Sequence, residues 1–137
     1  MAVGYGGAGG YYVELSLDGL LVAAGLHQPA GDQLDRYRRA IDDGRRAAGF
    51  ERAVEHAESA GLELARPELK TAPRGYPTTH PRIRFLRLRE LTVHRRHALE
   101  PWLHTPECDA RVRAELEAAK PLVVWLAEQV GPSQRNR

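Results

Sequence analysis

The feature that most constrains this fold is an Asp-Gly pair, Asp18-Gly19, between two runs of residues that favour β-strands. Asp-Gly is a strong signal for the tight turn of a hairpin, because the turn needs backbone angles that few residue pairs accept. We therefore expect strands over Gly10–Leu17 and Leu20–Leu26. The second run is apolar on both faces, which is typical of a strand at the centre of a sheet that helices cover.

Helical periodicity follows the hairpin and returns near the carboxyl terminus. It predicts helices over Asp32–Asp42 and Arg46–Ala60, each with one apolar stripe. Thr105-Pro106 has the pattern of a helix start, with threonine as the N-cap and proline at the first helical position. We expect that helix to bend or break near Pro121, because proline removes a helical hydrogen bond.

The segment between these helices is irregular and rich in proline. We expect short extended pieces near Leu62–Ala65 and Leu69–Thr71, a helical turn from Pro81, and a strand over Arg89–His94. Together the elements predict an α+β fold, in which an antiparallel or mixed sheet contains the hairpin near the amino terminus and is packed by three to four helices. A length of 137 residues fits a single domain over 1–137, with a flexible lead over 1–9 and a frayed tail over 131–137.

Composition limits which cellular compartment and which cofactors we expect for this protein. Cys108 is the single cysteine, so an internal disulfide is excluded, and no apolar run is long enough for a transmembrane helix. We expect a cytoplasmic protein without a membrane partner. Gly4, Gly6 and Gly9 match the spacing of a nucleotide-binding loop but precede a strand, whereas that loop precedes a helix. We therefore expect no cofactor.

Basic residues are concentrated in one part of the chain. The net charge is only +2, yet residues 66–97 contain nine Arg or Lys against two Glu. This asymmetry favours an anionic partner near that segment. The alternative is that arginine is simply the preferred surface cation, since eighteen of the twenty basic residues are Arg.

The strongest candidate for a ligand site is the run LKTAPRGYPTTHPRI, Leu69–Ile83, in which three prolines and a glycine stiffen a loop. Its charged and orientable donors suit a phosphate or a carboxylate. The candidate ligand-binding residues are Lys70, Arg74, Tyr76, His80 and Arg82. The competing interpretation is that Arg74 and His80 fasten the loop to the domain through backbone carbonyls.

No catalytic constellation is present in the sequence, so catalytic residues remain unassigned. His94, His97 and His104 lack further ligands at metal-binding spacing, and we expect no metal site. The leading hypothesis is an uncharacterised protein that binds a small anionic ligand. The alternatives are a nucleic-acid-binding protein that uses the arginine-rich stripe 66–96, or an enzyme whose remaining site residues lie in a missing amino-terminal segment.

Several motifs resemble one known family. They are the Leu69–Ile83 run, Tyr11-Tyr12, Gly25-Leu26, Pro29, the helix DRYRRAID, Pro101-Trp102-Leu103 and Pro121–Leu126. In this order they resemble the domain-of-unknown-function family 2461, which has no established activity. The resemblance therefore implies a fold and little chemistry.

Members of that family usually have a further amino-terminal segment ahead of the tyrosine strand, with a Trp-Phe pair and a basic region. Nothing in this chain matches that segment, so we expect a shortened member that is the later part of a larger family domain. An uncovered sheet edge would then leave Tyr11, Tyr12, Val13, Leu21 and Val22 unusually exposed. We expect such a chain to be marginally stable or to self-associate through that edge.

Overall fold

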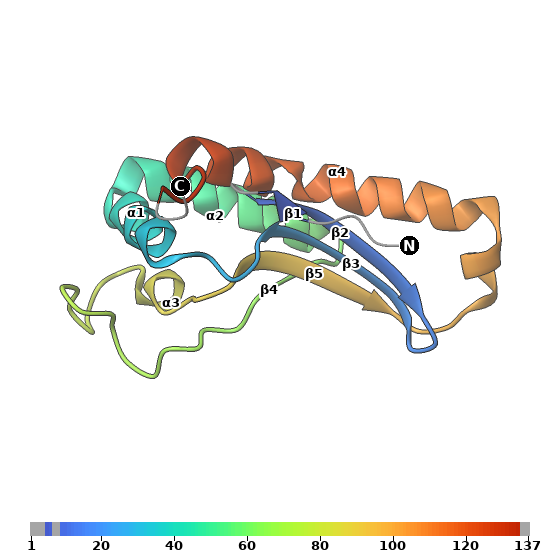
Figure 1. Cartoon of the computed structure of the whole chain (residues 1–137), viewed down its shortest axis with the longest axis horizontal. Helices are drawn as coiled ribbons and strands as arrows, with labels where there is room; N and C mark the ends of the chain where they lie inside the picture. The colour runs from blue at the N-terminus through green and yellow to red at the C-terminus, as the bar shows by residue number, and fades with distance from the viewer. Residues whose placement is uncertain (1–4, 7–8, 135–137) are drawn as a thin grey trace.

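A single antiparallel sheet and the helices along one of its faces make up the computed structural model, which describes residues 5–6 and 9–134 (Figure 1). The strands, in the spatial order β1-β2-β3-β5-β4, are β1 (Tyr5–Gly6), β2 (Gly9–Ser16), β3 (Gly19–Leu26), β4 (Glu63–Leu64) and β5 (Leu91–His97). The helices are α1 (Gly31–Asp42), α2 (Gly44–Ser59), α3 (Ile83–Leu86), the 3-10 turn η1 (Pro101–His104) and α4 (Pro106–Gln129). The predicted α+β fold is confirmed.

The hairpin near the amino terminus is formed by β2 and β3. Ser16 pairs with Gly19, so Leu17 and Asp18 form the turn, one position earlier than the predicted Asp18-Gly19. The difference has a physical reason. Gly19 has φ +120°, and a Cβ at this position would lie 2.0 Å from the carbonyl oxygen of His97. The glycine is therefore needed for the close approach of β5 rather than for the turn itself.

Strand β3 is central, as predicted, because it pairs with β2 on one side and β5 on the other. Helices cover this strand, as expected, but among the described residues they do so on one face only. Val22 and Ala24 face the helices, whereas Leu21 and Ala23 face the side that the long helices leave open. Antiparallel strands joined by hairpins need no crossover helix, so all long helices can lie on one side.

The main core lies between α1, α2, α4 and the sheet. Its centre is an aromatic cluster of Tyr37, Phe50, Phe85 and Trp125, with ring centroids 5.0 to 6.1 Å apart and most pairs edge to face. The Tyr37 hydroxyl donates a hydrogen bond of 2.9 Å to the Phe85 carbonyl. Such aromatic pairs stabilise a core beyond the burial of their area. They fix α3 against α1 and α2.

A second, smaller apolar cluster lies where η1 and the start of α4 meet the hairpin. It contains buried Val13, Leu20, Val22 and Leu103, with Trp102, Cys108, Val112 and Leu116 packed against it. Val13 and Val22 are only 7% and 0% exposed, so the expectation that they are uncovered is wrong. The physical reason is that α4 packs on this side of β2 and β3. Tyr11, Tyr12 and Leu21 are half-buried.

The prediction was a bend or a break near Pro121, and helix α4 does not break there, because it is continuous through this residue. Thr105 caps its start as expected, since the Thr105 side chain accepts a hydrogen bond of 3.2 Å from the Glu107 amide. Pro121 is exposed, while Leu122 and Leu126 on the following turn are fully buried. Their burial offsets the hydrogen bond that proline removes. No described helix is both long and apolar enough to cross a membrane.

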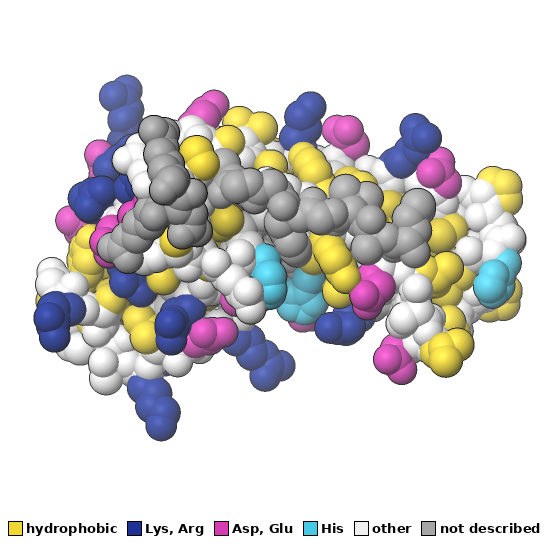
Figure 2. Space-filling model, in the orientation of Figure 1, with side chains coloured by type: hydrophobic (Ala, Val, Ile, Leu, Met, Phe, Trp, Pro, Cys, Tyr) yellow, Lys and Arg dark blue, Asp and Glu magenta, His cyan; other side chains and the backbone are white. Residues whose placement is uncertain are grey.

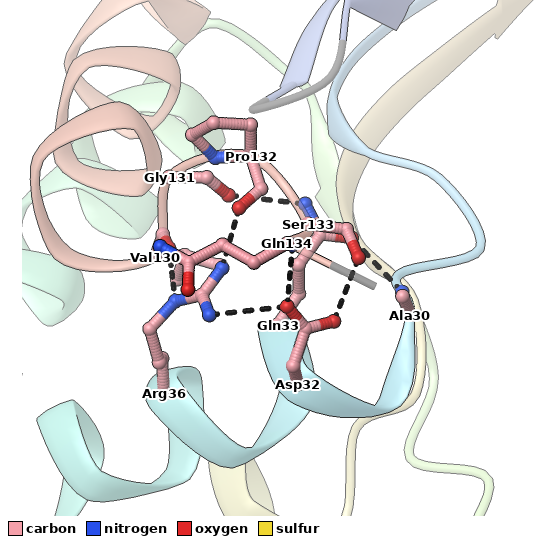
Figure 3. A network of polar contacts seen from close by, with 9 residues as sticks. All are labelled: Ala30, Asp32, Gln33, Arg36, Val130, Gly131, Pro132, Ser133 and Gln134. Atoms are coloured by element: carbon pink, nitrogen blue, oxygen red, sulfur yellow. Dashed lines mark hydrogen bonds and ion pairs between the residues drawn. The ribbon is translucent and has the colours of Figure 1, made fainter. Parts of the chain in front are cut away.

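The residues that follow α4 are held against the start of α1, as Figure 3 shows. Gln33 Nε2 donates 3.0 Å to the Gly131 carbonyl, and Asp32 accepts from Ser133 Oγ and the Gln134 amide at 2.8 Å each. The prediction of a frayed tail is therefore wrong for residues 131–134, while 135–137 lie outside the described residues. Of the expected flexible lead, the described residues Tyr5–Gly6 pair with β2.

The proline-rich segment contains fewer strands than expected. Only Glu63–Leu64 of the first extended piece forms a strand, and Leu69–Thr71 forms none. The helical turn after Pro81 is α3, and the last strand, β5, lies three residues further along than predicted at its carboxyl end.

Candidate functional site

Two of the predicted site residues fasten the proline-rich loop to α1. His80 is buried, and its Nδ1 accepts from the Arg82 amide at 3.0 Å, so Nε2 donates to Asp42 Oδ1 at 2.8 Å. Arg82 donates from Nε to the Ile41 carbonyl at 2.6 Å and from Nη2 to the Asp42 carbonyl at 3.1 Å. Cations at a helix carboxyl end satisfy its free carbonyls and its dipole. These contacts support a structural role for His80 and Arg82.

The other three predicted residues have different surroundings. Lys70 and Arg74 are exposed and make no hydrogen bond or ion pair with the described part of the chain. Tyr76 is half-buried against the main core, with its ring edge-on to His80 at 6.3 Å between centroids. Partial burial, with Asp42 nearby, raises the pKa of the Tyr76 hydroxyl. Lys70, Arg74 and Tyr76 therefore remain predicted ligand residues.

Many arginines of the stripe 66–96 are engaged within the molecule. Besides Arg82, Arg87 Nε donates 2.5 Å to the Leu69 carbonyl, and Arg95 Nη1 donates 2.9 Å to the Ala60 carbonyl. Arg84 stacks over the Phe85 ring, 4.5 Å from its centroid. These bonds attach a segment with little secondary structure to its neighbours, which explains much of the local excess of arginine.

A groove on the open face of the sheet was not predicted. The register places Tyr12 of β2 beside Ala23 of β3, and Ala23 beside His94 of β5. Because side chains alternate between faces with a period of two, Thr92 and Arg96 share the face of His94. The cavity has a volume of about 470 Å³, and its lining residues are Tyr12, Leu21, Ala23, His27, Thr92, His94 and Arg96. Figure 2 shows histidine side chains gathered beside acidic and basic ones near the middle of the molecule.

Carboxylates lie beside three of the polar side chains that line the groove. The Tyr12 hydroxyl donates 2.8 Å to Glu14, and this bond raises the pKa of Tyr12, so the phenol keeps its proton at neutral pH. His27 Nδ1 lies 2.8 Å from Glu90 Oε2. His94 Nε2 lies 4.0 Å from Glu63 Oε2. The hydrogen bond with Glu90 orients the His27 ring, whereas the separation between His94 and Glu63 is too long for a hydrogen bond.

Arg96 differs from the other polar residues of the groove. It is exposed and makes no ion pair or hydrogen bond with any described residue. It also lines an adjoining cavity of about 290 Å³ together with Gly61, Glu63, His94 and Arg95. The Arg96 guanidinium is therefore a cation available to a ligand at the boundary of two hollows.

The signal for this groove was present but incomplete in the sequence. Thr92, His94 and Arg96 alternate along one strand, which a period of two reveals. Their meeting with Tyr12 depends on the order β2-β3-β5, and that order joins residues about eighty positions apart. No local pattern specifies it.

A buried histidine–glutamate pair lies on the opposite face of the sheet. His97 Nε2 contacts both oxygens of Glu115, at 3.0 and 2.8 Å, and Arg95 Nη1 lies 3.7 Å from the same carboxylate. His97 and Glu115 are both buried, and Trp102 packs edge-on against His97. The pair joins β5 to α4 away from the groove. Among residues 9–134, no group of three or more His, Cys, Asp or Glu is arranged to hold a metal ion.

An antiparallel sheet with its long helices on one face and a polar groove on the other defines an α+β protein of a two-layer type. Residues 3–125 match the family model described as conserved hypothetical protein (DUF2461). The chain belongs to this family, which confirms the predicted resemblance. Comparison with curated proteins gave no match, and comparison with solved structures gave none either.

Proposed function

We propose that this protein binds a small molecule through an oxyanion, a phosphate or a carboxylate, in the groove on the open face of its sheet. The observation that supports the proposal most is Arg96, a guanidinium that lines the groove and has no partner among the described residues. The cation is placed by a central β-ladder rather than by a loop, so its backbone position is fixed.

The chemistry of the groove suits an anion with an apolar part. The planar fork of Arg96 can donate two parallel hydrogen bonds to a carboxylate or phosphate. His94 lies two residues before Arg96 on the same strand face and supplies a further orientable donor. Leu21 and Ala23 form an apolar floor beside the half-buried ring of Tyr12. An aromatic or aliphatic group attached to the oxyanion would bury its surface there.

The proline-rich loop is the competing location for an anion. Lys70 and Arg74 have no charged partner among the described residues, whereas His80 and Arg82 donate their hydrogen bonds to α1. A cavity of about 230 Å³ that Arg82 lines also contains Glu51, Glu55 and Glu58, and this acidic lining repels an anion. The groove therefore has the stronger support, and the loop residues serve as the comparison in the test.

Nucleic-acid binding is the second proposal, and it has weaker support. At least four arginines of the stripe are engaged in contacts within the molecule: Arg82, Arg84, Arg87 and Arg95. Fewer free cations give fewer phosphate contacts and a shallower dependence of affinity on salt. We expect only weak, salt-sensitive binding to an oligonucleotide. Submicromolar affinity that resists salt would make nucleic acid the better proposal.

Calorimetric titration with phenyl phosphate and with benzoate tests the anion site, because both probes join an oxyanion to an apolar ring. We expect Arg96→Gln to weaken binding of both by about tenfold or more, since a hydrogen bond to a charged group contributes about 1.5–3 kcal/mol. Arg45→Gln, at an exposed arginine on α2 remote in sequence from the groove, is the matched control and should leave the affinity unchanged.

Arg74→Gln separates the two locations. If it weakens binding while Arg96→Gln does not, the anion site is in the proline-rich loop and the proposal for the groove is wrong. If neither substitution changes the affinity, or neither probe binds at millimolar concentration, the proposal also fails.

A further inference from the structure

The groove on the open face of the sheet adjoins a second hollow, of about 290 Å³, at the side of the sheet away from β1. Its lining residues are Gly61, Glu63, His94, Arg95 and Arg96. His94 and Arg96 line both hollows, so a ligand whose oxyanion binds Arg96 can extend a substituent into the second one. Most small-molecule sites occupy about 300–1,000 Å³, so this hollow fits part of a ligand rather than a whole one.

Glu63 gives the second hollow a hydrogen-bond acceptor. Its side chain is 80% exposed, and its carboxylate accepts no hydrogen bond from any residue that the structure describes. His94 Nε2 lies 4.0 Å from Glu63 Oε2, beyond hydrogen-bond distance. The Glu63 carboxylate can therefore accept from a hydroxyl or an ammonium group of a ligand.

The register of β4 and β5 places Glu63 close to Arg96. Glu63 pairs directly with His94, and Arg96 lies two residues further along β5 on the same face. Diagonal neighbours of this kind lie about 7–8 Å apart, within reach of long side chains. No ion pair joins Glu63 to Arg96 in the described part of the chain. One small ligand between them can therefore donate to Glu63 and accept from Arg96.

The charges around Glu63 decide which donor fits. Arg95 and Arg96 both line the hollow, and their guanidinium groups would repel an ammonium group beside Glu63. Glu115 offsets part of the charge of Arg95, at 3.7 Å, but Arg96 has no such partner among the described residues. A hydroxyl carries no charge, and its hydrogen bond to a carboxylate is of the strong, charge-assisted kind. The hollow therefore favours a hydroxyl over an ammonium.

We propose that the ligand is a hydroxylated organic anion, whose hydroxyl donates to Glu63 in the second hollow while its oxyanion accepts from Arg96. The inference rests on the proposed function, because it needs an oxyanion bound at Arg96. It adds the group that distinguishes the ligand from a simple anion. An apolar part of the same ligand would lie on Leu21 and Ala23 in the groove.

Three probes that differ at one position test this class. Phenylpropanoate has a ring and a carboxylate, phenyllactate adds a hydroxyl beside the carboxylate, and phenylalanine has an ammonium there instead. We expect one enantiomer of phenyllactate to bind the wild-type chain about tenfold more tightly than phenylpropanoate in calorimetric titration, because its hydroxyl can donate to Glu63. Phenylalanine should have no advantage over phenylpropanoate.

Glu63→Ala tests the acceptor. It should reduce the advantage of phenyllactate over phenylpropanoate to about twofold or less. The ratio of the two affinities isolates the hydrogen bond, because both probes carry the same charge and a general electrostatic effect of the substitution cancels. Glu58→Ala, at an exposed carboxylate that lines a neighbouring cavity together with Glu63, is the matched control and should keep the wild-type ratio. Thermal melts verify that both variants stay folded.

The outcomes separate this inference from the anion site itself. Arg96→Gln should weaken both phenyllactate and phenylpropanoate. If no probe binds, or if Arg96→Gln changes neither affinity, the proposed anion site fails and this inference fails with it. If Arg96→Gln weakens binding but phenyllactate has no advantage in the wild type, or keeps its advantage in Glu63→Ala, only the hydroxyl inference is wrong. An equal loss of the ratio in Glu58→Ala, or an advantage of phenylalanine in place of phenyllactate, would also overturn it.

Discussion

At the scale of single residues, Glu115 on α4 is a buried carboxylate, only 5% exposed, that faces the sheet. Burial of an unpaired charge is costly, and both oxygens of Glu115 contact His97 Nε2. The geometry of the pair is defined, because the His97 ring nitrogen on β5 contacts a carboxylate on α4. It fixes the position of α4 over β5, and so it supports the rigid sheet on which the groove lies.

Removal of this carboxylate should cost stability. We expect Glu115→Ala to lower the free energy of unfolding by about 3 kcal/mol, since loss of one partner leaves the other buried without compensation. Glu115→Gln keeps an acceptor for His97 and should cost less. Urea denaturation measures both, with Glu117→Ala at an exposed position of the same helix as the control. A cost for Glu115→Ala no larger than that of the control would contradict the structural role of the pair.

The Asp32 carboxyl leads to a prediction about how the stability of the fold depends on pH. The hydrogen bond from the Gln134 amide, with help from Ser133 and Arg36, lowers the pKa of the Asp32 carboxyl well below its ordinary value. A lowered folded-state pKa stabilises the fold above the unfolded-state pKa of about 3.9, and the contribution is lost as the pH falls below that value. Asp32→Asn should therefore lower the melting temperature at pH 7 and change it progressively less below about pH 4.

The matched control for this prediction is Asp35→Asn, at an exposed position on the same helix. Asp35→Asn should change the melting temperature little, both at pH 7 and below about pH 4. Faster hydrogen exchange at the Gln134 amide in Asp32→Asn would connect the lost stability to release of residues 131–134. An unchanged exchange rate would show that Asp32 does not hold this segment.

At the scale of elements, α4 shows how tertiary packing overrides local preference. Pro121 lies inside the helix, where it cannot donate to the carbonyl of Glu117, and a helix-interior proline costs about 3 kcal/mol. The helix continues because Leu122 and Leu126 are buried in the main core. Pro121→Ala should then stabilise the protein by about 2 kcal/mol, after about 1 kcal/mol is subtracted for the greater entropy of the unfolded chain.

Chemical denaturation measures this change directly. Pro132→Ala, beyond the end of α4, is the control and should have a small effect, since Pro132 lies outside any regular helix. If Pro121→Ala destabilises the protein, the proline is not a strained position in a continuous helix. The packing account of α4 would then be wrong.

The contrast between local preference and tertiary packing also explains which elements could be predicted from the sequence. Local signals located β2, β3, α1, α2 and the start of α4, because turn residues, apolar periodicity and the Thr105 cap act over a few neighbouring positions. They misplaced the turn by one residue, because Gly19 is required by the distant carbonyl of His97. They also predicted a bend or break at Pro121, because the burial that keeps the helix continuous comes from contacts with other elements.

The candidate site was predicted less well than the fold. The proline-rich loop was predicted as the ligand site because its donors are close in sequence. His80 and Arg82 instead donate hydrogen bonds to α1, and no local sequence pattern specifies these bonds. The groove joins Tyr12 to Arg96 across three strands, so it depends on sheet order and register. Those properties are set by the packing of the whole chain.

At the scale of the whole molecule, the structure has two layers, a helical layer and a sheet, that differ in what they contain. The helical layer holds the aromatic core and the His97–Glu115 pair, and it covers one face of the sheet. The other face has a hollow with an apolar floor, histidine side chains and the guanidinium of Arg96, which has no partner among the described residues. We propose that this division lets the open face bind an anion while the helical layer keeps the strands rigid.

A proton–nitrogen correlation spectrum recorded during titration with phenyl phosphate tests this central claim most directly, because it locates the ligand residue by residue. The account predicts saturable shifts of the backbone amides of Ala23, Thr92, His94 and Arg96, and their loss in Arg96→Gln. Shifts confined to Lys70–Arg82, or shifts that do not saturate at any part of the chain, would contradict it.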